Sequence, residues 1–236
     1  MSKGYGQFCP IAKAAELLCE RWMALVLREL MYGSRRFNEI ARGVPLMSRG
    51  LLSARLQQLV DAGVARRTAA GDYLLTPPGE ALRPIIEGMG LWALHWGQAG
   101  LSEHDLDDQL LMWALRRYLR VPPAFQERRI VLRFDFFGLP PSARTAKRSW
   151  WLLVEHGDVE VCIKDPGYET DVTVAADLRS FVEVLLARRT LAAAVRARVI
   201  RVTGAPALAR SLPQWLPLNG ETKSSLGIVP VRTMGA

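Results

Sequence analysis

Residues 48–62 place the strongest constraint on how this chain can fold, because they join a helix start signal to a single apolar stripe. Ser48 is a favourable N-cap residue, and Leu52, Leu56 and Leu59 follow at the i, i+4, i+7 spacing of one helical face. We expect this helix to pack through its leucines. The opposite face then carries mostly small side chains, namely those of Gly50, Ser53, Ala54 and Gln57.

Three shorter helices are predicted before it. Residues 10–31 form two of them, because apolar side chains recur at helical spacing in two stretches before Gly33 stops the pattern. Residues 35–41 form the third, with Phe37 and Ile40 on its buried side. Together these helices supply a small core on which the leucine stripe can pack.

A two-stranded ribbon and a long helix are predicted to follow. The strands are Val64–Thr68 and Tyr73–Leu75, joined by a loop at 69–72. Thr76 then precedes two prolines, which is typical of an N-cap and a first helical turn, and this helix runs to about Ala99. A short helix, a turn, a longer capped helix and a ribbon, in this order, are typical of a winged helix-turn-helix, which binds DNA.

The charge distribution agrees with a nucleic-acid-binding surface. The formal net charge of +8 favours an anionic partner but says nothing about the fold. Residues 35–67 hold seven arginines against two acidic residues, so the basic excess lies on the predicted DNA-binding motif. Any one of these arginines is as easily a solvated surface charge. Their clustering on this motif favours DNA binding.

The predicted DNA contacts follow from position on the motif. Arg49, near the start of the leucine-backed helix, can reach guanine O6 and N7 or a phosphate. Arginines on the ribbon are placed for minor-groove or phosphate contact. The predicted DNA-contacting residues are Arg35, Arg36, Ser48, Arg49, Ser53, Arg55, Gln57, Arg66 and Arg67.

The second half predicts an α+β domain after a helical connector at 101–124. Residues 128–136 alternate between apolar and polar side chains, as a half-buried strand does. A hairpin turn at 155–158 separates two more apolar runs. The remaining predicted elements are strands at 150–154, 159–163, 172–174 and 199–203, and helices at 177–186, 191–195 and 207–215.

The predicted fold class is therefore α+β with two domains. Residues 1–100 form the winged helix-turn-helix, which is mainly helical with a two-strand wing. Residues 125–217 form an antiparallel sheet with helices on one face. Residues 218–236 are polar and glycine-rich, and we expect a loose tail.

No motif in the sequence indicates catalysis, a cofactor or a metal site. The chain has no Gly-x-Ser-x-Gly, P-loop or dinucleotide-binding glycine motif, and its three histidines lack metal-ligand spacing. Three cysteines do not make a disulfide framework. Since no signal peptide and no apolar run of about 18 residues is found, we expect a cytoplasmic protein without a membrane partner.

The first hundred residues also carry a family resemblance. Its residues are Cys9-Pro10, Arg21-Trp22, Arg36-Phe37-Asn38-Glu39-Ile40, Met47-Ser48, Leu51-Leu52, Arg55-Leu56, Leu59, Gly63-Val64, Tyr73, Leu75-Thr76 and Gly79. In this spacing, residues 7–97 resemble the HxlR-type branch of winged-helix regulators. The resemblance implies a homodimer whose terminal helices pair, here the helix 77–99 together with the helix 10–19. The loop at 69–72 is shorter than usual in the family, which puts strong wing contacts in doubt.

The same resemblance implies a sensing cysteine at the position of Cys9. Thiolates are stabilised at helix N-termini, and Cys9 directly precedes Pro10 at such a terminus. The alternative is a packed, inert cysteine, which is the commoner case. Cys9 is therefore the redox-sensor candidate.

Residues 127–216 resemble sterol-carrier-protein-type lipid-binding domains, through pattern more than through signature residues. The hairpin 151–163, the strand 171–175 and the helix 177–186 carry the resemblance, together with a strand at 199–204 that leads into the last helix. Such domains commonly have glycine where this chain has Arg196-Ala197-Arg198. The resemblance implies an apolar ligand cavity, although the same side chains can simply fill a core. The candidate wall residues are Phe134, Phe136, Trp151, Phe181, Leu185, Leu212 and Trp215.

These observations predict a DNA-binding transcription regulator, a repressor that binds operator DNA as a homodimer. Its C-terminal domain is expected to sense a hydrophobic small molecule. Two other classes stay open. One is a protein-interaction module whose winged helix does not read DNA, and the other is a lipid carrier with a vestigial DNA-binding domain.

Overall fold

The computed structural model describes residues 4–96, 100–119, 121–122, 127–141, 149–186 and 188–215. The chain divides into two compact units, Met1–Gly97 and Gln98–Ala236, and each has its own hydrophobic core. The predicted tail at 218–236 lies outside the described residues. Within the described parts, no helix combines the length and the apolar character that crossing a bilayer requires.

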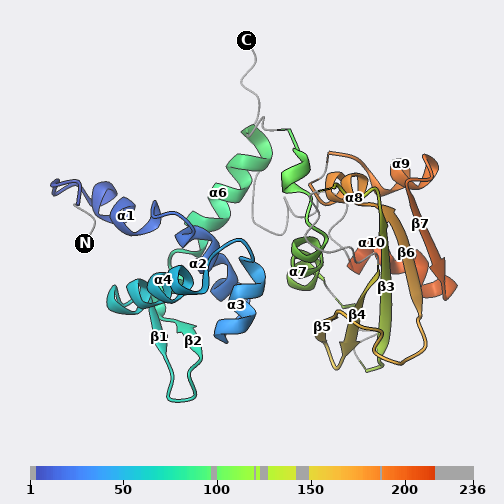
Figure 1. Cartoon of the computed structure of the whole chain (residues 1–236), viewed down its shortest axis with the longest axis horizontal. Helices are drawn as coiled ribbons and strands as arrows, with labels where there is room; N and C mark the ends of the chain where they lie inside the picture. The colour runs from blue at the N-terminus through green and yellow to red at the C-terminus, as the bar shows by residue number, and fades with distance from the viewer. Residues whose placement is uncertain are drawn as a thin grey trace, which may run out of the picture. The chain divides into compact units, whose positions relative to one another are not determined.

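Four helices open the first unit, as the apolar spacing predicts (Figure 1). α4 begins at its predicted cap, since Ser48 Oγ accepts a hydrogen bond from the backbone N–H of Leu51 at 3.3 Å. Trp22 separates the first two helices and has a left-handed backbone with φ of 78°. The four helices are α1 (Pro10–Leu18), α2 (Met23–Met31), α3 (Phe37–Gly43) and α4 (Arg49–Asp61).

The ribbon forms as predicted, from the short antiparallel strands β1 (Ala65–Arg67) and β2 (Tyr73–Leu75). It projects away from the helices in Figure 1. The backbone N–H of Tyr73 donates to the carbonyl of Arg35 at 2.9 Å, which ties the ribbon to the start of α3.

The single long helix predicted from residue 77 is wrong. The chain forms a one-turn helix, α5 (Pro77–Glu80), and then α6 (Arg83–Trp96). The break coincides with long-range contacts on both sides, because Gly79 packs against the backbone of Val64 and Arg83 Nη1 donates to the carbonyl of Met31 at 3.1 Å. The residues between the two helices turn with i to i+3 hydrogen bonds. Leu82 donates to Gly79 at 3.1 Å, and Ile85 donates to Leu82 at 3.0 Å.

The core of the first unit lies between α2, α3, α4 and the ribbon. Leu52, Leu56 and Leu59 are each at most 1% exposed and pack with side chains of α2 and α3. Burying a leucine contributes about 2 kcal/mol, so this packing decides which face of α4 points inward. Ile86 of α6 joins the same core, while most other large apolar side chains of that helix are exposed.

The second unit contains a five-stranded sheet in the order β5-β4-β3-β6-β7. The predicted hairpin forms between β4 and β5, which pair antiparallel. The prediction of an antiparallel sheet is wrong for one pair, because β3 and β6 run parallel. The connection at 163–171 returns the chain along the sheet, so β6 has the same direction as β3 and β5. The strands are β3 (Ile130–Phe137), β4 (Ser149–Glu155), β5 (Asp158–Cys162), β6 (Val172–Asp177) and β7 (Ile200–Gly204).

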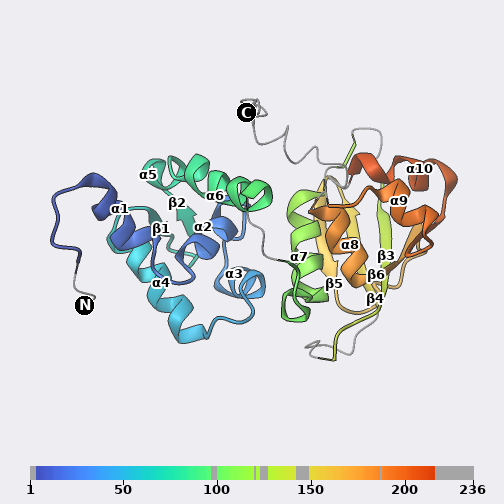
Figure 2. The ribbon, with the colours of Figure 1, turned by 90° about the horizontal axis from the view of Figure 1, so that it is seen from above.

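Helices cover one face of this sheet, as predicted. All of them except the short η1 (Glu103–Asp105) contribute to one buried cluster, which takes alternate residues of β3 from the sheet. Figure 2 shows α7 beside β5 and α8 beside β6. The helices are α7 (Asp108–Tyr118), α8 (Leu178–Leu185), α9 (Leu191–Arg196) and α10 (Pro206–Trp215).

Helix α7, placed in the connector by the sequence, is packed into the core of the second unit through Leu111, Met112 and Leu115. It also carries a buried acid, Asp108, whose carboxylate accepts a hydrogen bond from Trp150 Nε1 at 2.7 Å. Because an unsatisfied buried carboxylate is costly, this bond fixes α7 against β4.

Substitution of Gly79 by alanine tests how closely α5 packs. The added Cβ would lie 2.1 Å from the backbone carbonyl oxygen of Val64, which a side-chain rotation cannot relieve. We expect Gly79→Ala to lower the free energy of unfolding by about 1–3 kcal/mol in urea titrations. Gly50→Ala is the control, because its Cβ meets no atom within 4 Å. Equal stability of the two variants would contradict the packing.

Candidate nucleic-acid interface

The outer face of α4 is open to solvent. Gly50, Ser53, Ala54 and Gln57 are all exposed, opposite the buried leucines. Gln57 is held along the helix by a hydrogen bond from its Nε2 to Asp61 at 2.7 Å. A lean helical face of this kind can enter the major groove of B-DNA, which is about 12 Å wide.

Arg49 is held at the start of α4 by two residues of α3. Its Nη2 donates a hydrogen bond to Asn38 Oδ1 at 2.5 Å, and its guanidinium carbon lies 5.2 Å from the ring centroid of Phe37. The side chain is nevertheless exposed. Because a guanidinium has five N–H donors, Arg49 can keep these contacts and still bind a guanine edge or a phosphate.

Four more of the predicted DNA-contacting arginines are exposed. Arg66 and Arg67 lie on β1, which packs against α4. Arg35 and Arg36 precede α3, and Arg36 Nε lies 3.9 Å from the carboxylate of Asp72. Exposed ion pairs contribute little stability, so Arg36 can exchange this carboxylate for a phosphate.

Arg55 differs from the other arginines, and its surroundings argue against the predicted DNA contact. Its side chain is only 12% exposed, and Nη2 lies 2.7 Å from Glu20 Oε2. Nε donates to the backbone carbonyl of Arg21 at 3.1 Å, and Nη1 donates to Gln58 Oε1 at 2.7 Å. Position 55 borders the leucine stripe, which turns the guanidinium toward the protein.

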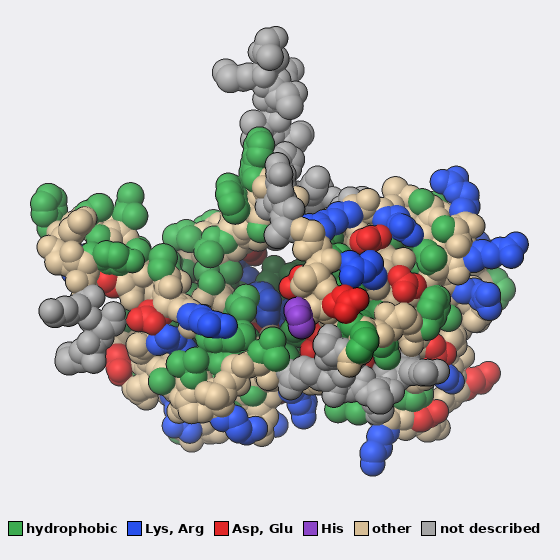
Figure 3. All heavy atoms as spheres, turned by 45° about the horizontal axis from the view of Figure 1, so that its top comes forward, with side chains coloured by type: hydrophobic (Ala, Val, Ile, Leu, Met, Phe, Trp, Pro, Cys, Tyr) green, Lys and Arg blue, Asp and Glu red, His purple; other side chains and the backbone are tan. Residues whose placement is uncertain are grey.

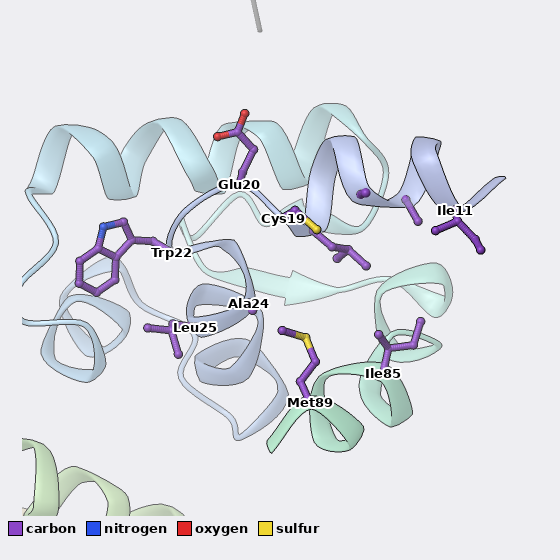
Figure 4. Close-up of a pocket in the computed structure, with 11 residues that line it drawn as sticks. Ile11, Cys19, Glu20, Trp22, Ala24, Leu25, Ile85 and Met89 are labelled. Atoms are coloured by element: carbon purple, nitrogen blue, oxygen red, sulfur yellow. The ribbon is translucent and has the colours of Figure 1, made fainter. Parts of the chain in front are cut away.

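An apolar groove of about 430 Å³ lies between α1, α2 and α6. Figure 4 shows its lining, in which Leu25, Ile85 and Met89 come from α2 and α6. Large apolar side chains that line it are exposed, with Ile11 at 79% and Met89 at 52%. Figure 3 shows such hydrophobic side chains gathered on α1 and α6. Exposed apolar patches of this kind mark interaction sites.

The three cysteines are free thiols in different surroundings. Cys9 is half-buried at the N-cap of α1, where its side chain makes no capping hydrogen bond. Cys19 is exposed just after α1 and lines the groove. Burial raises the pKa of the Cys162 thiol, which disfavours its reactive thiolate form. The redox-sensor role of Cys9 stays a prediction.

The predicted ligand-pocket residues are packed side chains of the second unit. Three of them are phenylalanines whose ring centroids lie 5.9–6.2 Å apart. Trp151 is 8% exposed and lies outside this cluster. Leu212 also lines a groove of about 460 Å³ between α9, β7 and α10. The hydrophobic cluster contains Phe134, Phe136, Phe181, Leu212 and Trp215, and the half-buried Leu185 packs against it.

Sequence reasoning missed two residues that hold the arginines of α4. Asn38 holds Arg49, and Glu20 holds Arg55. Glu20 lies in the corner between α1 and α2. No local pattern, however, pairs this residue with one 35 positions later.

Comparison with known proteins concerns mainly the first unit. A family model for HxlR-like helix-turn-helix domains matches residues 17–100. An uncharacterized HTH-type transcriptional regulator of Bacillus subtilis, YvaP, is 38% identical over 97 residues, which are 38% of this chain and 90% of YvaP.

Solved structures give matches of low score. Quinone-bound YodB of B. subtilis matches with a TM-score of 0.35 and 35% identity, over 37% of this chain and 99% of YodB. The ubiquinone synthesis protein UbiJ-SCP2 matches with a TM-score of 0.33 and 24% identity, over 44% of this chain and 88% of that protein. Scores at this level do not establish a shared fold, so a ligand cavity in the second unit stays a prediction.

Ser48 caps α4, and its removal should weaken the interface helix. Ser48→Ala is expected to lower the free energy of unfolding by about 1 kcal/mol, because the N–H of Leu51 loses its side-chain acceptor. Ser53→Ala, in the exposed middle of the same helix, should change it by less than about 0.5 kcal/mol. Thermal unfolding followed by circular dichroism measures both. A larger loss for Ser53→Ala would contradict the assignment of the cap.

Proposed function

Because the chain belongs to the HxlR-like helix-turn-helix family, we propose that it is a transcription regulator that reads operator DNA through the outer face of α4. Arg49, Ser53 and Gln57 face the base edges, while Arg66 and Arg67 bind phosphates beside them. The observation that carries the proposal is the exposed, lean side of α4, which the buried leucines hold outward. Sequence is read by such base-edge contacts, and phosphate contacts fix the register.

The proposed assembly is a homodimer in which a second copy covers the groove between α1, α2 and α6. The exposed apolar side chains of α1 and α6 support a partner of the same apolar character. Helix-turn-helix dimers present two recognition helices to half-sites one DNA turn apart. The operator would then be a pseudopalindrome.

Repression and small-molecule sensing complete the proposal, and both rest on resemblance. A quinone is bound in the YodB structure, and we propose that Cys9 responds to oxidants or electrophiles in this chain. The groove beside Leu212 is the place we propose for a hydrophobic ligand of the second unit, since its volume of about 460 Å³ falls within the range of small-molecule sites. Native mass spectrometry of the purified chain tests for such a ligand.

Selection of bound duplexes from a random pool tests the central proposal. Arg49→Gln should weaken binding of the selected duplex by about 1–3 kcal/mol and relax specificity at one position. Arg67→Gln should weaken all duplexes alike and reduce the slope of log affinity against log salt by about 0.9. Fluorescence anisotropy at several salt concentrations measures both effects.

Arg201→Gln is the matched control for these variants, because Arg201 is an exposed arginine of the other unit. It should leave the affinity for the selected duplex almost unchanged. Unaltered DNA binding by Arg49→Gln would instead favour the protein-interaction alternative.

A charge placed in the groove should separate the two copies. Ile85→Glu buries an unpaired carboxylate against apolar side chains, so we expect dimer dissociation to rise about 100-fold. Sedimentation velocity across a concentration series measures this constant. Phe137→Glu, at an exposed apolar site of the second unit, is the control. A dimer that survives Ile85→Glu would show that the copies meet elsewhere.

A further inference from the structure

Arg55 is the one arginine of α4 that the DNA proposal does not use, and its contacts point elsewhere. Its guanidinium forms a charge-assisted hydrogen bond to Glu20 and also holds the carbonyl of Arg21 and the amide of Gln58. Glu20 is itself only 28% exposed in its side chain. Charge-assisted bonds to carboxylates are short and directional, so this pair fixes α4 relative to the corner between α1 and α2.

The corner between α1 and α2, which Arg55 contacts through Glu20 and Arg21, is also part of the groove wall. Glu20 lines the groove together with Cys19 and Trp22. Figure 4 shows the Glu20 carboxylate pointing away from the apolar side chains of Leu25 and Met89. Glu20 therefore has the groove on one side and the interface helix on the other.

We propose that Glu20 and Arg55 form a positioning pair that couples occupation of the groove by a second copy to the placement of α4 on DNA. This inference rests on the proposed function, in which a second copy fills the groove and α4 reads the duplex. Arg55 acts through Glu20 and makes no DNA contact itself.

The physical basis is the weak anchoring of α1. This helix has no fully buried residue, so few of its contacts with its own protomer hold it in place. A second copy seated in the groove would order α1 and the corner that follows it. The Glu20–Arg55 bond then fixes the position of α4 as well. Coupling between two binding events is reciprocal, so DNA binding should in turn strengthen the dimer.

Glu20→Gln in the full chain gives the decisive measurement. Removing an acidic side chain from a DNA-binding unit should, by charge alone, strengthen binding to DNA. The proposal requires the opposite, an affinity about tenfold lower for the selected operator. The salt slope should stay unchanged, because no phosphate contact is lost. Fluorescence anisotropy at five salt concentrations gives both quantities.

A half-site duplex isolates the coupling, because it engages the α4 of a single protomer. The wild-type dimer should bind this duplex about tenfold more tightly than the monomeric Ile85→Glu chain. In Glu20→Gln this difference should vanish although the dimer persists. Arg55→Gln should lose the same difference in affinity. The double variant should bind DNA as tightly as either single variant, since both substitutions remove the same bond.

Glu16→Gln is the matched control, because Glu16 is an acid of α1 that pairs with Lys13 and not with α4. It should bind the operator as tightly as the wild type or more tightly. Far-UV circular dichroism and the melting temperature establish that each variant is folded.

Two results would overturn the coupling and leave the proposed function standing. One is operator binding by Glu20→Gln that equals or exceeds the wild type. The other is a salt slope that falls by about 0.9 in Arg55→Gln, which would make Arg55 a phosphate contact. If the wild-type chain selects no duplex or forms no dimer, the proposed function fails and the coupling fails with it.

Discussion

The burial of the leucine face of α4 is the interaction on which the rest of the first unit depends. Leu52, Leu56 and Leu59 are buried against α2 and α3. The opposite face of α4 is then the face exposed to solvent. Burial of three leucines contributes about 6 kcal/mol, which is large beside the stability of a typical domain. The small outer residues, the cap at Ser48 and the neighbouring ribbon take their positions from this contact.

The two units differ in how many of their large apolar side chains are exposed. The second unit packs Phe134, Phe136 and Phe181 into its buried cluster, and Asp108 accepts a hydrogen bond from Trp150 there. The first unit leaves tryptophans of α6 and much of α1 in solvent beside an apolar groove. A protein surface of this kind is costly unless something covers it. The first unit therefore presents an exposed apolar surface of the kind that marks interaction sites.

Much of the fold could be predicted from the sequence, because helix and strand periods are local properties. The spacing of the leucines, the Ser48 cap, the ribbon and the hairpin of β4 and β5 were all visible in the residues. The break between α5 and α6 and the parallel pairing of β3 with β6 were not. Both depend on how residues far apart in the chain pack, as Gly79 does against Val64.

The sequence by itself determined which face of α4 would be buried and which would be exposed, since both follow from helical periodicity. Only the tertiary structure decided which of the arginines stays exposed and which is held by other side chains. Arg49 and Arg55 look equivalent in the sequence, because both flank the predicted outer face of the same helix. Folding places Asn38 beside the first and Glu20 beside the second. Arg49 stays exposed beside a neutral amide, whereas Arg55 is largely buried because its guanidinium forms an ion pair with Glu20 and a hydrogen bond to the carbonyl of Arg21.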